Sequence, residues 1–361
     1  MMAQEKFSVD TVRVSRTSYA TSGVDISAAD MAKQLMQQAV QATQGKDVLA
    51  GMGAFAGILD AGSIKNMQRP ALVASTDGVG TKILLATQAG RFDTIGYDLV
   101  NHCVNDLLAQ GARPLFFMDY LAMPKLDPQQ AASIVKSVAA ACQEVGCILL
   151  GGETAEMPGV YLPGALDLAG TIVGVVERDA IVDGSTIVAG DVLLGLPSSG
   201  LHTNGYSLAR RIIASYPLDT VFPELGEPLV EALLRPHRSY LHEIELLRTL
   251  LENEAVSHPA IKGIAHITGG GFAGNIVRIL PAGMQAVVQT NAWNPPPLFQ
   301  LLAHLGQVNR EEMYHTFNMG IGLVIVVSQA TVEHVRRLLP EALPIGFIKE
   351  GEGVMLGDIS Q

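Results

Sequence analysis

The segment Ser75-Thr-Asp77-Gly-Val-Gly80-Thr-Lys82, which begins at the end of the largely apolar run 71–76, does most to indicate the fold. An apolar run of this length that ends in glycines predicts a buried strand, and α/β proteins bind ligands at the carboxyl ends of such strands. Asp77 could hold Mg²⁺, which takes oxygen ligands, and the glycines would let backbone N–H groups approach phosphate oxygens. The same residues also fit a plain turn that closes a hairpin. The spacing is not that of a Walker A loop, and the glycines at 51–57 do not fit the dinucleotide-binding pattern.

The segments around this turn alternate between helix and strand patterns. Residues 27–44 predict a helix capped by Ser27, and Asp127-Pro128 predicts the start of another, with Asp as the cap and Pro in the first turn. Further helices are expected at 98–110, 204–216, 229–252 and 272–280, and strands at 71–76, 115–123, 147–150, 168–176, 192–196 and 285–289. Both halves mix helices with strands, which predicts an α+β or α/β protein.

The length of 361 residues suggests roughly two domains. A polar, turn-rich stretch at 177–191 is the best candidate for the boundary. We therefore expect an N-terminal domain at 23–177 and a C-terminal domain at 178–361. The polar residues 1–22 predict a mobile arm.

Composition excludes several classes of protein. Lys and Arg total 24 against 35 Asp and Glu, and this net charge of −11 argues against binding of a nucleic-acid backbone. The N-terminal residues contain no apolar core of signal-peptide length, and no uninterrupted apolar run is long enough to span a membrane. The three cysteines, Cys103, Cys142 and Cys147, fit no zinc or redox spacing. We expect a cytoplasmic protein with buried, reduced thiols and no membrane or nucleic-acid partner.

The predicted helix at 98–110 carries a polar stripe. At about 100° per residue, Asp98, His102, Asn105 and Asp106 share one side, opposite an apolar side. Buried carboxylates and an imidazole are unfavourable unless they are paired or bind a ligand. The alternative is a solvated face with an ordinary His–Asp pair, although such faces usually carry Lys and Glu.

Three further segments place glycines beside polar residues. Gly151-Gly152-Glu153-Thr154 follows the predicted strand 147–150, so Glu153 could bind a cation or could lie in a solvated loop. Segments 198–205 and 266–275 lead small hydroxyl, amide and glycine residues into helix starts, which suits an anion. His202 lies in the first of these, which lacks the GxSxG pattern of a hydrolase nucleophile.

Six of these segments, in this order, closely resemble the phosphoribosylformylglycinamidine cyclo-ligases, also called aminoimidazole ribonucleotide synthetases. They are STDGVGTK (75–82), CVNDLLAQGARPLFFMDY (103–120), GGETAEMPGVY (151–161), SSGLHTNGYSLAR (198–210), HITGGGF (266–272) and MYHTFNMGIG (313–322). GVDI at 23–26 and IGFIKEG at 345–351 extend the resemblance over nearly the whole chain.

The resemblance implies a two-domain α+β subunit with the ATP-binding fold of these synthetases. It also implies a homodimer in which the N-terminal domains form a β-barrel-like interface. The implied reaction is the ATP-dependent ring closure of formylglycinamidine ribonucleotide to 5-aminoimidazole ribonucleotide, with ADP and phosphate, in purine biosynthesis. ATP would activate the formamide oxygen as an iminophosphate, and an amidine nitrogen would then displace phosphate.

Carried onto this sequence, the resemblance implies Mg²⁺ as the cofactor, with ATP as co-substrate. The implied metal ligands are Asp77, Asp106 and Glu153. The implied ATP-binding residues are Asp77, Gly78, Gly80, Thr81, Lys82, Gly151 and Gly152. The implied substrate-binding residues are Ser198, Ser199, His202, Thr203, Asn204, Thr268, Gly269, Gly270 and Gly271. His202, as a handler of protons, and Lys82 are the implied catalytic residues.

Related families fit less well. Selenophosphate synthetase would need a cysteine in the N-terminal glycine-rich loop, but no cysteine precedes Cys103. A hydrogenase-maturation dehydratase would need a C-terminal cysteine, whereas this chain ends Asp-Ile-Ser-Gln. Thiamine-monophosphate kinase is the nearest enzymatic alternative, and a non-catalytic nucleotide-binding scaffold is the other. The scaffold reading predicts substituted acids, but Asp77, Asp106 and Glu153 are all present.

Overall fold

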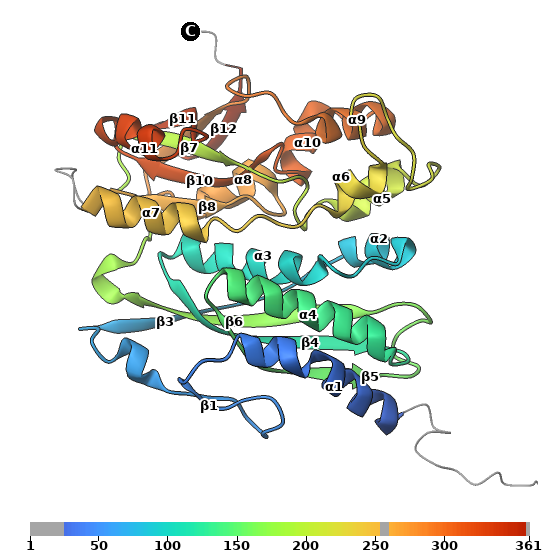
Figure 1. Ribbon diagram of the computed structural model, residues 1–361. Coiled ribbons are helices and arrows are strands. Elements are labelled where there is room, and N and C mark those ends of the chain that lie inside the picture. Colours follow the sequence, from blue (N-terminus) through green and yellow to red (C-terminus); the bar gives the residue numbers. More distant parts are fainter. Residues whose placement is uncertain (1–24, 253–259, 359–361) are drawn as a thin grey trace, which may run out of the picture.

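The computed structural model describes residues 25–252 and 260–358, which form two α+β units, each built on its own sheet (Figure 1). The arm predicted at 1–22 lies outside the described residues. No helix within the described ranges is long and apolar enough to cross a membrane. Cys103, Cys142 and Cys147 are buried free thiols, as expected.

The first sheet has four strands in the order β3-β6-β4-β5. Their bounds are Pro70–Gly78 for β3, Arg113–Met123 for β4, Ile148–Glu156 for β5 and Asp167–Glu177 for β6. β6 pairs antiparallel with both β3 and β4, whereas β4 and β5 run parallel. The helices of this half are α1 (Ile26–Ala42), α2 (Lys82–Ala89), α3 (Ile95–Ala109) and α4 (Pro128–Glu144), and a short hairpin is formed by β1 (Val48–Ala50) and β2 (Ile58–Leu59).

The second sheet has six strands in the order β12-β9-β11-β7-β10-β8. Their bounds are Val192–Pro197 for β7, Gly263–His266 for β8, Met284–Gln289 for β9, Ile321–Val327 for β10, Leu343–Glu350 for β11 and Gly353–Gly357 for β12. Its helices are α5 (Tyr206–Ile212), α6 (Leu229–Leu234), α7 (Leu241–Glu252), α8 (Gly271–Ile276), α9 (Pro297–Gly306), α10 (Arg310–Thr316) and α11 (Val332–Leu338). Every residue of β10, which lies between β7 and β8, is buried, as its continuous apolar sequence leads one to expect.

Helix α3 joins the two halves. It packs on β3 and β6 of the first sheet and also contacts β8 and α7 of the second half (Figure 1). Twelve of its 15 residues are buried, including Asp98, His102 and Asn105 of the polar stripe. The stripe is therefore not a solvated face but part of the junction between the domains.

Three local predictions need correction. The cap of α1 is Asp25 rather than Ser27, because Asp25 Oδ1 accepts hydrogen bonds from the N–H groups of Ser27 (2.9 Å) and Ala28 (3.2 Å). The helix predicted at 229–252 is two helices, α6 and α7, and the break contains Pro236, which disfavours helix in the residue before it. β5 runs on to Glu156 because it pairs with β4 over this length, so the segment 151–154 is strand rather than loop.

Other predictions are confirmed. Asp127 caps α4 through its Oδ1, which accepts from the backbone N–H groups of Gln129 and Gln130 (3.0 Å each), with Pro128 in the first turn. The helix expected at 98–110 is α3, and a strand, β3, is found where one was expected at 71–76. The expectation that this strand is buried was wrong, because β3 is an edge strand whose residues are exposed or half-buried. The turn-rich stretch at 177–191 lies between the last strand of the first sheet and the first strand of the second, while the domain bounds 23–177 and 178–361 stay predictions.

Candidate active site at the domain junction

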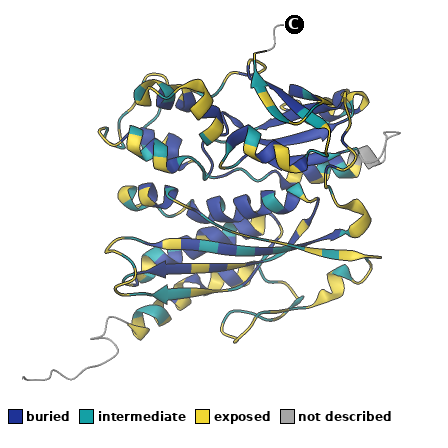
Figure 2. Ribbon diagram, turned by 180° about the vertical axis from the view of Figure 1, so that it is seen from behind, coloured by how far each residue is buried: buried dark blue, intermediate teal, exposed yellow. Residues whose placement is uncertain are grey.

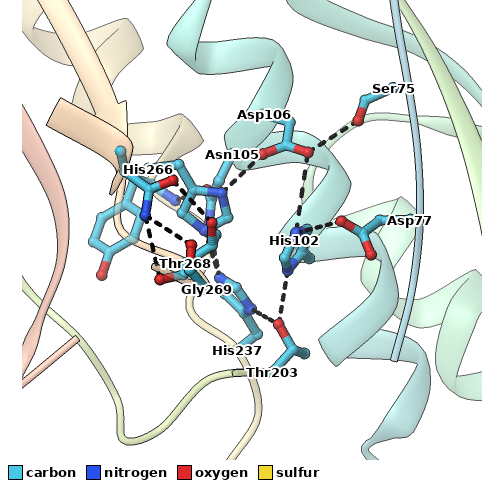
Figure 3. A network of polar contacts seen from close by, with 12 residues as sticks. Ser75, Asp77, His102, Asn105, Asp106, Thr203, His237, His266, Thr268 and Gly269 are labelled. Carbon is cyan, nitrogen blue, oxygen red and sulfur yellow. Dashed lines mark hydrogen bonds and ion pairs between the residues drawn. The ribbon is translucent and has the colours of Figure 1, made fainter. Parts of the chain in front are cut away.

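Polar side chains gather where α3 faces the second half of the chain (Figure 3). Asp77 lies near the end of β3, and His102 and Asp106 lie one turn apart on α3. Thr203 comes from the loop after β7, and His266 is the last residue of β8. The site is therefore built by both domains.

His102 lies between two carboxylates. Its Nε2 is 2.8 Å from Asp77 Oδ2 and 4.0 Å from Asp106 Oδ2. Burial alone would raise the pKa of Asp77, but the hydrogen bond and charge of His102 outweigh it, and the pKa lies below its usual value. Burial opposes ionisation of Asp106 in the same way, yet its hydrogen bond to His266 lowers the pKa. Both acids are therefore anionic near neutral pH.

The acids also have neutral hydrogen-bond partners. Ser75 Oγ donates to Asp106 Oδ2 (2.9 Å), and the backbone N–H of Gly78 donates to Asp77 Oδ1 (2.7 Å). Burial lowers the pKa of His102, but its contacts with Asp77 and Asp106 raise it above the usual value overall. The site thus pairs two anions with one imidazole that readily holds a proton.

His237 is a member of this network that the sequence analysis missed. It lies between α6 and α7, and its Nδ1 is 3.3 Å from Thr203 Oγ1 while its Nε2 is 3.1 Å from His266 Nε2. Thr203 Oγ1 also lies 2.7 Å from His102 Nδ1. The flanking residues Pro236 and Arg238 form no recognisable motif, so nothing local in the sequence marks His237.

The predicted phosphate and substrate turns meet at this junction. A Cβ placed on Gly80 would lie 3.9 Å from the carbonyl oxygen of Thr203, and Thr81 Oγ1 lies 3.1 Å from Ser207 Oγ. A Cβ on Gly269 would lie 3.4 Å from Asn204 Oδ1. The structure thus brings the 78–81 turn of the first half next to the loop around Thr203 and Asn204, and that loop next to Gly269.

Other predicted substrate residues hold the turns in shape. Ser199 Oγ donates to the carbonyl of Pro236 (2.6 Å), and Ser198 Oγ donates to the carbonyl of Gly200 (2.9 Å). Thr268 Oγ1 donates to Asn275 Oδ1 (3.2 Å). Gly270 and Gly271 both have positive φ angles (89° and 60°), and a Cβ on Gly271 would lie only 1.9 Å from a backbone oxygen. Only glycine fits there.

Two predicted catalytic residues lie inside the protein rather than on an open surface. Lys82 is fully buried, and its Nζ lies 2.6 Å from both Asp98 Oδ1 and the carbonyl oxygen of Arg235. In this arrangement its ammonium is held by a carboxylate and a backbone carbonyl of the protein.

His202 is also fully buried. It adopts a positive φ of 61°, and its ring stacks on His237 with centroids 3.9 Å apart. The backbone N–H of Ser199 donates to its Nε2 (3.2 Å). Burial holds the pKa of His202 well below its usual value, so the ring is neutral.

Glu153 does not join the other two acids within one chain. It lies on β5, at the opposite edge of the sheet from Asp77 on β3. Three strand spacings of about 4.8 Å separate these edges, about 14 Å in all. Gly151, Gly152 and Glu153 instead line a cavity of about 740 Å³, together with α1 and the glycine-rich loop 51–57. Asp119 also lines this cavity, and burial raises its pKa to about 7.

Family models and named relatives match most of this chain. Residues 58–176 match the family model described as AIR synthase related protein, N-terminal domain, and residues 188–356 match the corresponding C-terminal domain. A protein of Geobacillus thermodenitrificans named phosphoribosylformylglycinamidine cyclo-ligase is 50% identical over 344 residues, which cover 93% of this chain and 97% of that protein. A protein of the same name from Myxococcus xanthus is 46% identical over the same shares.

Solved structures show the same fold at lower identity. Thiamine-monophosphate kinase from Stenotrophomonas maltophilia superposes with a TM-score of 0.64 at 19% identity, covering 90% of this chain and 96% of that one. E. coli HypE, a hydrogenase maturation protein, superposes with a TM-score of 0.63 at 19% identity, covering 91% of this chain and 93% of that one. These two likenesses concern the fold alone.

Proposed function

Because the chain belongs to the AIR synthase related family, we propose that its domain junction is the site where Mg²⁺–ATP and formylglycinamidine ribonucleotide react. The chain is an ATP-dependent cyclo-ligase that forms a C–N bond. It closes the ring of formylglycinamidine ribonucleotide to give 5-aminoimidazole ribonucleotide, ADP and phosphate in purine biosynthesis. The observation that supports the location is the convergence of Asp77 and Asp106 with the turns at 78–81 and 203–204. We place the reaction in the cytoplasm, where free thiols such as the buried Cys103, Cys142 and Cys147 stay reduced.

Asp77 and Asp106 fit a Mg²⁺ ion. Each offers a carboxylate oxygen, these lie within 4.8 Å of one another and of His102, and both side chains are partly exposed. Oxygen ligands that leave room for water and phosphate are what Mg²⁺ prefers. The bound ion would neutralise charge on the phosphates of ATP. Both acids are already anionic, so no proton has to leave before the ion binds.

The other side of the junction suits the ribonucleotide. Asn204 Nδ2 is buried and, among the described residues, has no hydrogen-bond partner, although it lies beside Gly269. An unpaired buried donor is unfavourable unless a ligand satisfies it. We propose that Asn204, Thr203 and the 268–269 turn contact the substrate. The buried side chains of His202 and Lys82 would support the segments that form this surface.

The test is incubation of the protein with ATP, Mg²⁺ and formylglycinamidine ribonucleotide. We expect 5-aminoimidazole ribonucleotide and ADP to form in equal amounts, and no ADP to form when the ribonucleotide is omitted. Thiamine monophosphate serves as the control acceptor. Phosphorylation of thiamine monophosphate without ring closure of the ribonucleotide would assign the chain to the kinases instead.

We also propose that the chain forms a homodimer through the uncovered face of the first sheet. α3 packs on the other face, and the strands of the first sheet include exposed positions (Figure 2). Among them, Leu72 of β3 is 68% exposed, and Met118 and Tyr120 of β4 are 41% and 37% exposed. Exposed apolar side chains gathered on one face mark protein contacts. Pairing of two such faces would give the barrel-like interface that the family resemblance implies. Glu153 could then join an ATP site only with the help of a second subunit.

Replacing Tyr120 with aspartate should convert the dimer to a monomer. The charge would have to lose its water inside an apolar interface, which strongly opposes association. Sedimentation equilibrium should give twice the chain mass for the unaltered protein and the chain mass for Tyr120→Asp. Leu49→Asp, an exposed apolar position on β1, is the matched control and should stay dimeric. Unaltered protein that sediments at the chain mass would contradict the proposal.

A further inference from the structure

Three histidines from distant parts of the chain meet at the domain junction. His102 comes from α3, His237 from the segment between α6 and α7, and His266 from the end of β8. One ring nitrogen of each lies within 4.8 Å of the others. The ring centroids are 5.0 to 5.3 Å apart, and all three side chains are buried (Figure 3). We call this group the histidine cluster.

The hydrogen bonds around His237 fix one of its nitrogens as an acceptor. Asn105 is oriented by two backbone contacts, because its Oδ1 accepts from the N–H of Tyr240 (3.0 Å) and its Nδ2 donates to the carbonyl of Arg238 (2.8 Å). The second hydrogen on Asn105 Nδ2 points to His237 Nε2, and these two nitrogens are 3.2 Å apart. His237 therefore carries its proton on Nδ1, facing Thr203 Oγ1, and Nε2 presents a lone pair.

His266 presents a second lone pair to the same space. Its Nδ1 lies 2.9 Å from Asp106 Oδ1, and because a carboxylate oxygen accepts, Nδ1 donates its proton there. Nε2 of the neutral His266 ring then carries no hydrogen. It lies 3.1 Å from His237 Nε2, which also carries none. Two lone pairs at this distance repel unless a proton or a metal ion lies between them.

The distances and surroundings suit a metal ion. Two nitrogens bound to one tetrahedral Zn²⁺ at about 2.05 Å are about 3.3 Å apart, close to the 3.1 Å found here. Ligating histidines usually donate their other N–H to a carboxylate or another oxygen, and the cluster already has Asp106 on His266 and Asp77 on His102. For His237 the corresponding oxygen is Thr203 Oγ1, 3.3 Å from Nδ1, and Asp98 Oδ1 accepts from the backbone N–H of His237.

We propose that the histidine cluster binds one divalent transition-metal ion, of the Zn²⁺ class, and thereby ties α3 to the C-terminal domain. Binding replaces the 3.2 Å contact of Asn105 and turns the Thr203 hydroxyl away from a ring nitrogen. Three imidazoles leave a fourth position open for water or a ligand. The site is separate in chemistry from the proposed Mg²⁺ site, because Mg²⁺ selects oxygen and Zn²⁺ selects nitrogen ligands.

The test uses the full, untagged chain freed of metal by a chelator. Calorimetric titration with Zn²⁺ in excess Mg²⁺ should show one saturable site per chain, and Co²⁺ should give the visible absorption bands of a four- or five-coordinate ion. The temperature of unfolding should rise by several degrees with Zn²⁺, because the ion binds only the folded chain.

Variants locate the ion. His237→Gln should weaken Zn²⁺ binding about 100-fold or more, since loss of a ligand exceeds the 10- to 100-fold effect of losing an outer partner. His304→Gln, an exposed position on α9, is the matched control and should bind normally. If circular dichroism shows that His237→Gln does not fold, His102→Gln takes its place.

No saturable Zn²⁺ binding, or normal affinity in a folded cluster variant, would overturn the proposal. Neither result would bear on the proposed ring closure, because that reaction is assayed with Mg²⁺, ATP and formylglycinamidine ribonucleotide and without Zn²⁺.

Discussion

Replacing Asp77 with asparagine is expected to lower kcat/KM for ring closure by about 10²- to 10³-fold, the usual effect of removing one preorganised charge-stabilising group. Asp77 lies at the carboxyl end of β3, is partly exposed and is anionic because His102 lowers its pKa. Asparagine has nearly the same shape but no charge, so it would hold Mg²⁺–ATP poorly. The measurement is the steady-state formation of 5-aminoimidazole ribonucleotide at saturating Mg²⁺.

The control for this variant is a substitution of Asp179, which lies near the other end of β3. Asp179 is exposed beside Arg69, which directly precedes β3, and Asp179→Asn should leave kcat/KM within about twofold because a surface ion pair contributes little. Circular dichroism should show that both variants keep their fold. Unchanged turnover in Asp77→Asn would remove Asp77 from the site.

Replacing Lys82 with methionine is expected to lower the free energy of unfolding by about 3–5 kcal/mol, the typical effect of breaking a buried ion pair. Lys82 and Asp98 are both fully buried, with Nζ and Oδ1 2.6 Å apart. Methionine would fill the space but leave the Asp98 carboxylate without its cation. Urea unfolding at pH 8, followed by circular dichroism, would measure the loss.

The loss should depend on pH. Burial raises the pKa of Asp98 to about 6 even in the presence of Lys82, and removal of the cation should raise it further. A carboxyl group whose pKa is raised in the folded state favours folding when protonated, and that contribution is lost as pH rises through the folded pKa. Lys82→Met should therefore be less destabilised at pH 5 than at pH 8.

A surface pair provides the comparison. Arg69→Met breaks the exposed contact with Asp179 and should change the free energy of unfolding by at most about 1 kcal/mol. The double variant Lys82→Met/Asp98→Asn should recover part of the loss, because no buried charge remains unpaired. If Lys82→Met were as stable as the unaltered protein at pH 8, the ion pair would not be formed in solution.

Local chemistry in the sequence was enough to determine most of the elements. Strand β3, helix α3 and the Asp127 cap of α4 follow from apolar periodicity and from the side chain that satisfies the first N–H groups of a helix. The order of six motifs was enough to identify the family, which the comparisons confirm. The placement of Asp77 at a strand end was also predictable, because strand ends and glycines are local signals.

Only the tertiary structure decided which of these residues share a site. The family motifs group Glu153 with Asp77, but β3 and β5 are opposite edges of one sheet. The sequence of neither strand determines the order of the strands in the sheet. Lys82 looked like a phosphate ligand, yet the packing of α2 against the second half buries it on Asp98. His237 lies 135 residues after His102, and contact between them depends on how two sheets pack around α3, which no local pattern encodes.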